Sequence, residues 1–264
     1  MKNILEDIIA GKKAEVEAKK SVKPGFSDQE LHFGENIRSL LQKMENNSSS
    51  FISEFKRKSP SGFCLPEVHT LESVITNYEK AGASALSVLT DQYYFGGSVE
   101  DITTALRISS LPVLRKEFII DEYQVFETKA IGANIILLIA KILAPEKTKQ
   151  FAYLSKQLGM EVLIEVKTEI ELEEHYTPFA DFIGVNNRNL DTLVTDIETS
   201  FLLAEKIPDG KKKISESGIY SAEQVRKLQN AGYDGFLVGE SLLRSQQPGE
   251  KLKELMKKGK VYEN

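Results

Sequence analysis

The segment Phe51-Ile52-Ser53-Glu54-Phe55-Lys56-Arg57-Lys58-Ser59-Pro60-Ser61-Gly62 alternates apolar and polar residues, then becomes charged and ends in Ser, Pro and Gly. The alternation predicts a β-strand, and the Ser-Pro-Ser-Gly sequence predicts the loop that ends it. Because side chains two positions apart share one face of a strand, Ile52, Glu54 and Lys56 lie on the same side. The strand therefore directs charge inward at its C-terminal end, unless these residues form a solvated ion pair at the strand end.

From Phe51 onward, short β-like runs alternate with amphipathic helical segments, several of which end in Gly, as helices that lead into a strand commonly do. Repeated βα alternation implies parallel strands joined by helices, and eight units in about 210 residues fit an α/β fold of the (β/α)₈ TIM-barrel type. A doubly wound sheet is the alternative, but no Gly-x-Gly-x-x-Gly follows the first strand. The predicted strands span residues 51–56, 85–90, 112–116, 134–139, 161–166, 182–185, 213–216 and 235–238.

The first fifty residues have helical periodicity. Residues 2–20 and 36–44 each place apolar side chains at helical spacing, which predicts two amphipathic helices that lie on something larger. We therefore expect residues 1–264 to form a single barrel domain, with residues 1–50 as an N-terminal helical extension that packs on the barrel. No pattern in these fifty residues suggests chemistry.

The composition excludes several classes of protein. A net charge of −5 without a basic stripe argues against a nucleic-acid-binding protein. No apolar stretch approaches the roughly 20 residues that a membrane-spanning helix needs. The single cysteine, Cys64, excludes an intrachain disulfide and, alone, a cysteine-based metal cluster. A reducing cytoplasm is the natural setting for such a chain.

In a (β/α)₈ barrel the active site lies where the strands end and the βα loops begin, so residues at the predicted strand ends are site candidates. Lys116, at the end of the third strand, and Glu165, in the fifth, are the candidate acid/base groups. His69 and His175 fall outside the strand ends, and we expect them at the surface. The candidates are Glu54, Lys56, Ser59, Lys116, Glu165, Asn186, Arg188, Glu216, Ser217, Gly218, Gly239 and Glu240.

Two loops have features of a phosphate site. Barrels commonly bind phosphate with the loops after strands seven and eight, where backbone N–H groups face the anion. Ser217-Gly218 and Gly239-Glu240 lie at these positions, and Ser59 and Lys56 could reach the same anion. Ordinary turns and helix caps are the alternative interpretation of these dipeptides.

The charge on Lys116 decides between two kinds of chemistry. A lysine with the usual pKa of ~10.4 is protonated at neutral pH, and nearby carboxylates reinforce that form. Lys116 would then be a general acid. A Schiff-base nucleophile would need desolvation or a second cation such as Lys56. A third interpretation is that these residues are salt bridges that fill the top layer of the barrel.

Seven stretches together resemble the indole-3-glycerol phosphate synthase family of tryptophan biosynthesis. They cover every predicted strand except the fourth, in order, and the N-terminal helices of that family correspond to residues 2–46. The stretches are ISEFKRKSPS (52–61), LTD with YFGG (89–91 and 94–97), PVLRKEF (112–118), LIEV (163–166), GVNNRNL (184–190), SESGI (215–219) and LVGES (237–241).

This resemblance implies a lyase that closes a ring with loss of CO₂ and water, without cofactor or metal. The substrate would be 1-(2-carboxyphenylamino)-1-deoxyribulose 5-phosphate and the product indole-3-glycerol phosphate. By position, Lys116 resembles the general acid, Glu165 its partner in dehydration, and Lys56 the residue that meets the substrate carboxylate, held by Glu54. Asn186, Arg188, Glu216 and Ser217 match polar lining positions; Phe95, Phe118, Leu137, Leu190 and Leu237 match an apolar slot; Ser59, Gly218, Gly239 and Glu240 match phosphate contacts.

The chain departs from the family pattern at Glu117, where Asp is usual, and at Lys167, where His is frequent. Two alternatives stay open: another phosphate-binding barrel enzyme, such as phosphoribosylanthranilate isomerase with its Cys/Asp pair, or a non-catalytic barrel subunit. Cys64 lies past the end of the first strand, which weakens the first alternative. No lysine or glutamate candidate is replaced by an apolar residue, which weakens the second. Association with other tryptophan-pathway enzymes is a further expectation.

Overall fold

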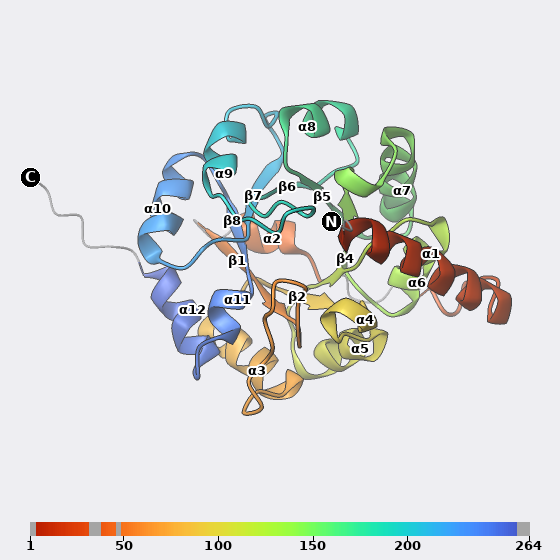
Figure 1. The fold of residues 1–264 in the computed structure, drawn as a ribbon, viewed down its shortest axis with the longest axis horizontal. Helices are drawn as coiled ribbons and strands as arrows, with labels where there is room; N and C mark the ends of the chain where they lie inside the picture. The colour runs from red at the N-terminus through yellow and green to blue at the C-terminus, as the bar shows by residue number, and fades with distance from the viewer. Residues whose placement is uncertain (1–3, 32–37, 46–48, 258–264) are drawn as a thin grey trace, which may run out of the picture.

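Eight parallel strands close into a barrel in the order β1-β2-β3-β4-β5-β6-β7-β8 (Figure 1). The computed structural model describes residues 4–31, 38–45 and 49–257. The predicted TIM barrel is therefore confirmed, and each strand end lies within one residue of its predicted position. The strands are β1 (Ser50–Phe55), β2 (Ala85–Leu89), β3 (Val113–Lys116), β4 (Ile135–Ile139), β5 (Glu161–Val166), β6 (Phe182–Asn186), β7 (Lys212–Glu216) and β8 (Gly235–Val238).

Helices surround the barrel and connect its strands. Where Gly was expected to end a helix, Gly82, Gly132, Gly159 and Gly232 all have positive φ, which L-residues rarely adopt. In the described residues no helix is long and apolar enough to cross a membrane. The helices are α1 (Ile4–Val22), α2 (Leu40–Glu45), α3 (Leu71–Ala81), α4 (Gln92–Phe95), α5 (Val99–Ile108), α6 (Glu122–Ala130), the 3₁₀ helix η1 (Ala140–Ile142), α7 (Pro145–Gln157), α8 (Glu169–His175), α9 (Glu198–Leu203), α10 (Ala222–Asn230), α11 (Glu240–Leu243) and α12 (Pro248–Met256).

Alternation along each strand separates two apolar layers. In β1, Ile52 belongs to the cluster inside the barrel, whereas Phe51 and Phe55 belong to the larger layer between the strands and the surrounding helices. Glu54 and Lys56, the latter just past the end of the strand, share the inward side with Ile52, since both line the pocket at the mouth of the barrel. The prediction that this strand directs charge inward at its C-terminal end is confirmed.

Helix α2 lies across the bottom of the barrel and is held by Glu161, the first residue of β5 (Figure 1). The Glu161 carboxylate accepts hydrogen bonds from Ser39 Oγ (2.5 Å) and from the backbone N–H groups of Leu40 (2.9 Å) and Leu41 (3.2 Å). Leu40 and Met44 join the apolar cluster inside the barrel. The helix predicted over 36–44 thus begins later than expected in the described chain, and residues 36 and 37 lie outside the described residues.

The expectation that His69 and His175 lie at the surface is wrong. Both side chains are buried, and each has a hydrogen-bond partner. His69 Nε2 lies 2.8 Å from the carbonyl oxygen of Ser245, and His175 Nδ1 lies 2.8 Å from Thr148 Oγ1. Burial lowers the pKa of His175, so the neutral ring is favoured there. Both histidines pack between elements of the outer layer and away from the strand ends.

Leu40→Ala tests whether α2 belongs to the core. Leu40 is fully buried, so its truncation should leave a cavity and lower the free energy of unfolding by about 2–5 kcal/mol. Urea unfolding followed by circular dichroism measures this loss. The control, Leu41→Ala, removes a half-buried leucine and should cost clearly less. Equal losses for the two variants would contradict the packing of Leu40 inside the barrel.

Candidate active site

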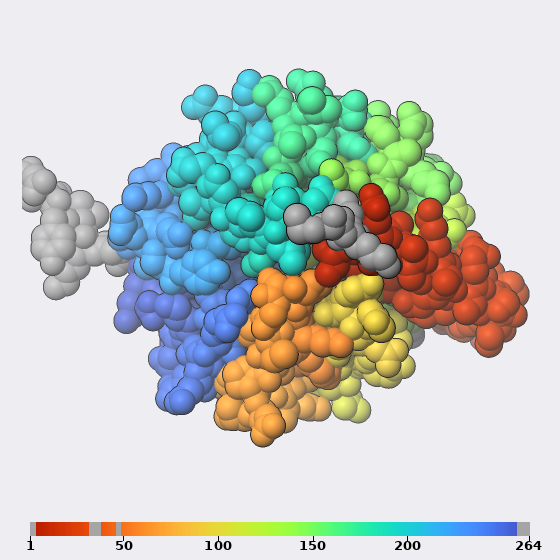
Figure 2. All heavy atoms as spheres, in the orientation of Figure 1, coloured from red at the N-terminus to blue at the C-terminus, as the bar shows by residue number. Residues whose placement is uncertain are grey.

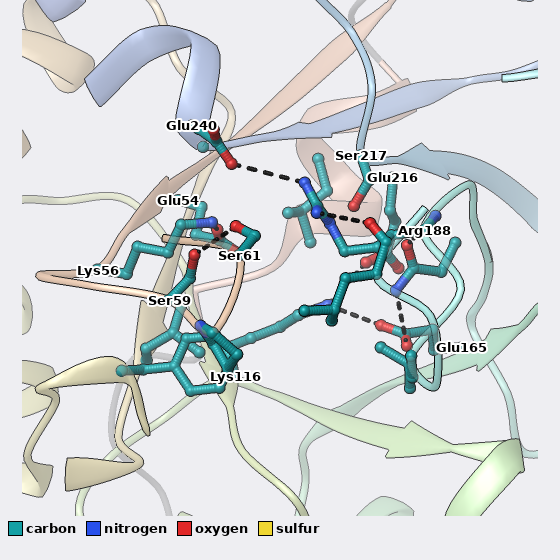
Figure 3. A pocket seen from close by; sticks show the side chains of 18 of the residues that line it. Glu54, Lys56, Ser59, Ser61, Lys116, Glu165, Arg188, Glu216, Ser217 and Glu240 are labelled. Carbon is teal, nitrogen blue, oxygen red and sulfur yellow. Dashed lines mark hydrogen bonds and ion pairs between the residues drawn. The ribbon is translucent and has the colours of Figure 1, made fainter. Parts of the chain in front are cut away.

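One large pocket opens at the C-terminal ends of the strands. It has a volume of about 1110 Å³, including the part open to solvent, and is lined by every residue that the sequence predicted as catalytic, substrate-binding or phosphate-binding. Figure 3 shows Lys56 and Ser59 on one side and Glu165 and Arg188 on the other. The strand ends thus bring together residues that are far apart in the chain.

Lys116 is the centre of a charged cluster inside this pocket. Its Nζ donates hydrogen bonds to Glu165 Oε2 (2.8 Å) and to Glu216 Oε2 (2.7 Å). Lys116 ends β3 and Glu216 ends β7, so the contact spans the interior of the barrel. The Asn186 side-chain amide, at the end of β6, donates to Glu165 Oε1 at 3.0 Å. One ammonium group is therefore held between two carboxylates in a fixed position.

The two carboxylates have opposite pKa shifts. Burial opposes ionisation of Glu165, but the Lys116 ammonium and the Asn186 amide outweigh it and lower the pKa of Glu165. Burial, together with the neighbouring charges of Glu165 and Glu54, raises the pKa of Glu216 to about 7 despite its contact with Lys116. Burial also disfavours the charged form of Lys116, but the surrounding carboxylates raise its pKa above the usual value. Lys116 is thus protonated at neutral pH.

Glu216 has a further feature that fits its raised pKa. Its Oε1 atom is buried and has no hydrogen-bond partner in the described part of the chain. This oxygen faces Gly184 in β6, where an added Cβ would lie only 2.1 Å away. An ionised oxygen without a donor is costly in a buried position, so the protonated carboxyl is favoured. The position of the Glu216 carboxyl group therefore requires glycine at position 184.

Lys56 lies on the opposite side of the pocket and pairs with Glu54. Its Nζ lies 2.6 Å from Glu54 Oε1, and both side chains are largely buried. Gly239, which follows β8, allows this arrangement, since a Cβ there would lie 2.4 Å from Glu54 Oε1. Glu54 therefore orients a second ammonium group toward the pocket.

Arg188 is the third cation of the pocket. Its backbone N–H donates to Asn186 Oδ1 (2.9 Å), and its Nη1 donates to the Leu193 carbonyl oxygen (3.1 Å). Its Nη2 lies 3.5 Å from Glu240 Oε2, as Figure 3 also shows. Glu240 in turn accepts two hydrogen bonds from Arg244. The ion pair between Arg188 and Glu240 thus connects the loops after β6 and β8 across the mouth of the pocket.

An apolar slot faces the charged cluster. The rings of Phe95, at the end of α4, and Phe118, just after β3, have centroids 6.1 Å apart. Leu137 from β4 and Leu237 from β8 belong to the same apolar cluster inside the barrel, and Leu190 packs against it. Together they form a surface that suits a flat aromatic ring.

Three loops meet at one side of the pocket: the loops after β7 and β8, and the first part of the loop after β1. Ser217 and Gly218 both have positive φ, of 68° and 76°, which turns the backbone sharply after β7. A Cβ at Gly218 would lie 2.7 Å from Thr195 Cγ2, so a larger residue would displace the loop. Ser59 Oγ lies 2.7 Å from Ser61 Oγ of the same loop, the one that follows β1. Gly239 and Glu240 complete this group.

Part of the pocket wall comes from a segment in which no pattern suggests chemistry. Ile4, Leu5 and Ile8 of α1 line the pocket and add apolar surface to it. The helical periodicity showed that these residues share a face, but it does not show where that face docks. Glu117, noted as a departure from the family pattern, also lines the pocket.

The described residues contain no group of three or more His, Cys, Asp or Glu side chains arranged to hold a metal ion. Their carboxylates at this site instead face lysine and arginine side chains. What the arrangement provides is proton donors and cations in an apolar-walled pocket.

Comparisons with known proteins identify the family of this chain. The family model described as indole-3-glycerol phosphate synthase matches residues 5–255. A protein of that name from Bacteroides thetaiotaomicron is 43% identical over 261 residues, covering 97% of this chain and 99% of the relative. Another from Aquifex aeolicus is 44% identical over 210 residues, covering 79% and 81%.

A solved tryptophan synthase α subunit from Legionella pneumophila matches with a TM-score of 0.59 and 16% identity, covering 82% of this chain and 95% of that one. At this identity, the likeness shows the barrel fold alone. The family model and the sequence relatives carry the functional assignment. The chain belongs to the indole-3-glycerol phosphate synthase family, and it is a carboxy-lyase of tryptophan biosynthesis that forms indole-3-glycerol phosphate.

Proposed function

We propose that Lys116 is the general acid of the ring-closing decarboxylation, with Glu165 as its partner in the dehydration. The observation that carries this assignment is the position of the Lys116 ammonium between Glu165 and Glu216, next to the apolar slot. The substrate is 1-(2-carboxyphenylamino)-1-deoxy-D-ribulose 5-phosphate. Its ketone oxygen gains negative charge during ring closure, and a fixed ammonium group stabilises such charge.

The reaction needs three proton transfers, two to the ketone oxygen, which leaves as water, and one away from carbon. Lys116 donates a proton to the ketone oxygen as the ring carbon that bears the carboxylate attacks the ketone carbon. Loss of CO₂ returns the bond electrons to the ring and restores its aromaticity. For the dehydration, Lys116 first regains a proton from solvent and gives it to the hydroxyl group, which leaves as water. Glu165 accepts the proton that the neighbouring CH₂ carbon loses as the indole double bond forms. The lowered pKa of Glu165 keeps it ionised and able to accept that proton.

Lys56 is proposed to meet the substrate carboxylate, with Glu54 holding its ammonium group in place. The aromatic ring would lie in the slot formed by Phe95, Phe118, Leu137, Leu190 and Leu237, with Asn186, Arg188, Glu216 and Ser217 as polar contacts around the sugar chain. Exclusion of water by the slot would strengthen the contacts of the ring carboxylate and ketone with the two lysines.

The phosphate group is proposed to bind where the loops after β1, β7 and β8 meet. Ser59 offers a hydroxyl group, while Gly218 and Gly239 allow the backbone to approach closely. Glu240 would contribute its backbone, because its carboxylate is turned toward Arg188 and Arg244. The ribulose chain would then span the pocket from this side to the slot.

Two alternatives fit the geometry less well. A Schiff-base role would need Lys116 to lose its proton, but the surrounding carboxylates raise its pKa. An isomerase with a catalytic cysteine would need Cys64 in the pocket, but Cys64 is exposed and is absent from the pocket lining. A proton-donating lysine explains the carboxylate contacts better than either.

We also propose that residues 1–264 act as a single barrel domain with residues 1–50 as an N-terminal helical extension, and that the protein works in the cytoplasm. The exposed free thiol of Cys64 supports a reducing compartment.

Membership of a biosynthetic family supports association with other enzymes of tryptophan biosynthesis. Co-purification with those enzymes at native concentration would test the last point.

Lys116→Met should lower kcat by at least about 10²-fold, as expected for loss of a general acid. Formation of indole product is followed by its fluorescence, which the protein disturbs little because the chain contains no Trp. Lys80→Met, at an exposed position on α3, is the matched control and should keep full activity. An active Lys116→Met variant would contradict the assignment.

The pKa of Glu216 predicts a pH dependence. Glu216 is mostly protonated below pH about 7 and mostly ionised above it. Ionisation adds negative charge beside Lys116, Glu165 and Glu54, which weakens Lys116 as an acid and repels an anionic substrate. We therefore expect kcat/KM to fall as pH rises through about 7, and Glu216→Gln, which cannot ionise, to lose this descending limb.

The comparison of the two pH profiles isolates Glu216, because the phosphate of the substrate titrates in both. Glu216→Gln keeps the shape of the side chain and a group that can contact Lys116. An unchanged descending limb in this variant would show that another group causes it.

A further inference from the structure

Lys12, in the N-terminal helix α1, is buried among carboxylates although it lies outside the charged cluster described above. Only 2% of its surface is exposed. Its Nζ lies 2.7 Å from Glu15 Oε2, 3.1 Å from Asp91 Oδ2 and 3.1 Å from Glu117 Oε1. Burial opposes its charged form, but Glu117, Glu15 and Asp91 outweigh burial and raise the pKa of Lys12. A buried, charged lysine with three acidic neighbours holds the surrounding segments together.

The first of these segments is the loop after β2. Asp91 is buried and caps α4, since its Oδ1 accepts a hydrogen bond from the Tyr94 backbone N–H at 2.7 Å. Its other oxygen, Oδ2, is the one that faces Lys12. Helix α4 ends at Phe95, one of the two aromatic residues of the slot. The position of the Phe95 ring therefore depends on a carboxylate that Lys12 holds.

The second segment follows β3. Glu117 Oε1, the oxygen that faces Lys12, also accepts the backbone N–H of Phe118 at 2.8 Å. Glu117 Oε2 accepts from Thr90 Oγ1 at 2.7 Å, which ties the ends of β2 and β3 together. Phe118 is the second aromatic residue of the slot, and Glu117 directly follows Lys116. One ammonium group thus contacts the residues that position both aromatic rings.

Helix α1 covers this part of the pocket. Ile4, Leu5 and Ile8 line the pocket, and Figure 2 shows the first turns of α1, in red, against the yellow segment that contains α4. Two further lysines hold α1 elsewhere: Lys19 pairs with Glu127 at 2.9 Å and Lys20 with Asp121 at 2.7 Å. Lys12 therefore differs from them, because two of its three partners, Asp91 and Glu117, belong to the loops that carry the slot.

We propose that Lys12 is a positioning residue that sets the aromatic slot, and thereby the enzyme's selectivity for the ring-bearing part of its substrate. This rests on the assignment of the slot to the aromatic ring under the proposed function. Without the ammonium group, Asp91 would lose the cation that faces it, and Glu117 would keep only the more distant Arg115, whose Nη2 lies 4.0 Å from Glu117 Oε2. The loops that carry Phe95 and Phe118 would then separate to admit water. Contacts to the phosphate end would stay in place.

Lys12→Met and two fragment inhibitors test the proposal. N-(2-carboxyphenyl)glycine carries the ring without phosphate, and ribulose 5-phosphate carries the phosphate without the ring. In Lys12→Met, we expect the inhibition constant of the ring fragment and the KM of the substrate to rise about tenfold or more, because displacement of the slot by about 1 Å is enough for such a loss. The inhibition constant of ribulose 5-phosphate should stay within about twofold.

Lys19→Met is the matched control on the same helix, and Lys12→Arg is the conservative variant. Lys19→Met should behave as wild type toward both fragments, and Lys12→Arg should recover most of the affinity for the ring. An effect of Lys12→Met on both fragments alike, an equal effect of Lys19→Met, or no effect at all would overturn the proposal. A general loss of stability would change the inhibition constants of both fragments and not that of the ring fragment alone.

A further variant keeps the test decisive if Lys12→Met does not fold. Asp91→Asn retains an oxygen that can cap α4 but removes the charge that faces Lys12. It should cause the same selective loss of the ring fragment, and unchanged binding would overturn the proposal. If the ring fragment does not compete with the substrate in the wild-type enzyme, the slot assignment itself fails and this proposal fails with it. If the ring fragment inhibits the wild-type enzyme and Lys12→Met equally well, only the positioning role of Lys12 is overturned.

Discussion

The pocket depends on one buried arrangement, the ammonium group of Lys116 between the carboxylates of Glu165 and Glu216. A lysine buried without partners would lose its proton, and two adjacent carboxylates without a cation could not both ionise. The barrel solves both problems at once, because β3, β5 and β7 place these side chains on the same inward face. The same contacts that keep Lys116 charged also leave Glu216 as the carboxyl that is hardest to ionise.

Much of this could be predicted from the sequence because the strand pattern has a period of two. Once Phe51 to Lys56 is recognised as a strand, the faces of Glu54 and Lys56 follow, and the repeated βα units then place every strand end at one mouth. The catalytic candidates needed no knowledge of distant contacts. Each one is inward-facing at the end of its own strand, or in the loop that follows it.

The N-terminal helices were predictable only in part. A helical pattern shows which residues share a face, but the partner of that face lies far along the chain. Helix α2 begins at Leu40, where Ser39 accepts the Gln42 backbone N–H and Glu161 accepts those of Leu40 and Leu41. The local sequence contains the serine, but it does not indicate the contact with Glu161. In the same way, Lys12 is one lysine among several in a charged helix. Its contacts with Asp91 and Glu117, which set it apart from the others, form only when the chain folds.

Lys12 and Lys116 also show how one residue type serves two purposes in neighbouring positions. Both are protonated and surrounded by carboxylates. Lys116 lines the pocket, whereas Lys12 lies behind it with its charge directed at the loops. Glu117 separates them, since it follows Lys116 in the chain and contacts Lys12 through its side chain. In the mechanism proposed above, Lys116 gives up a proton while Lys12 keeps its three carboxylate contacts, so the walls of the slot can stay in place while the charge at the reacting end changes.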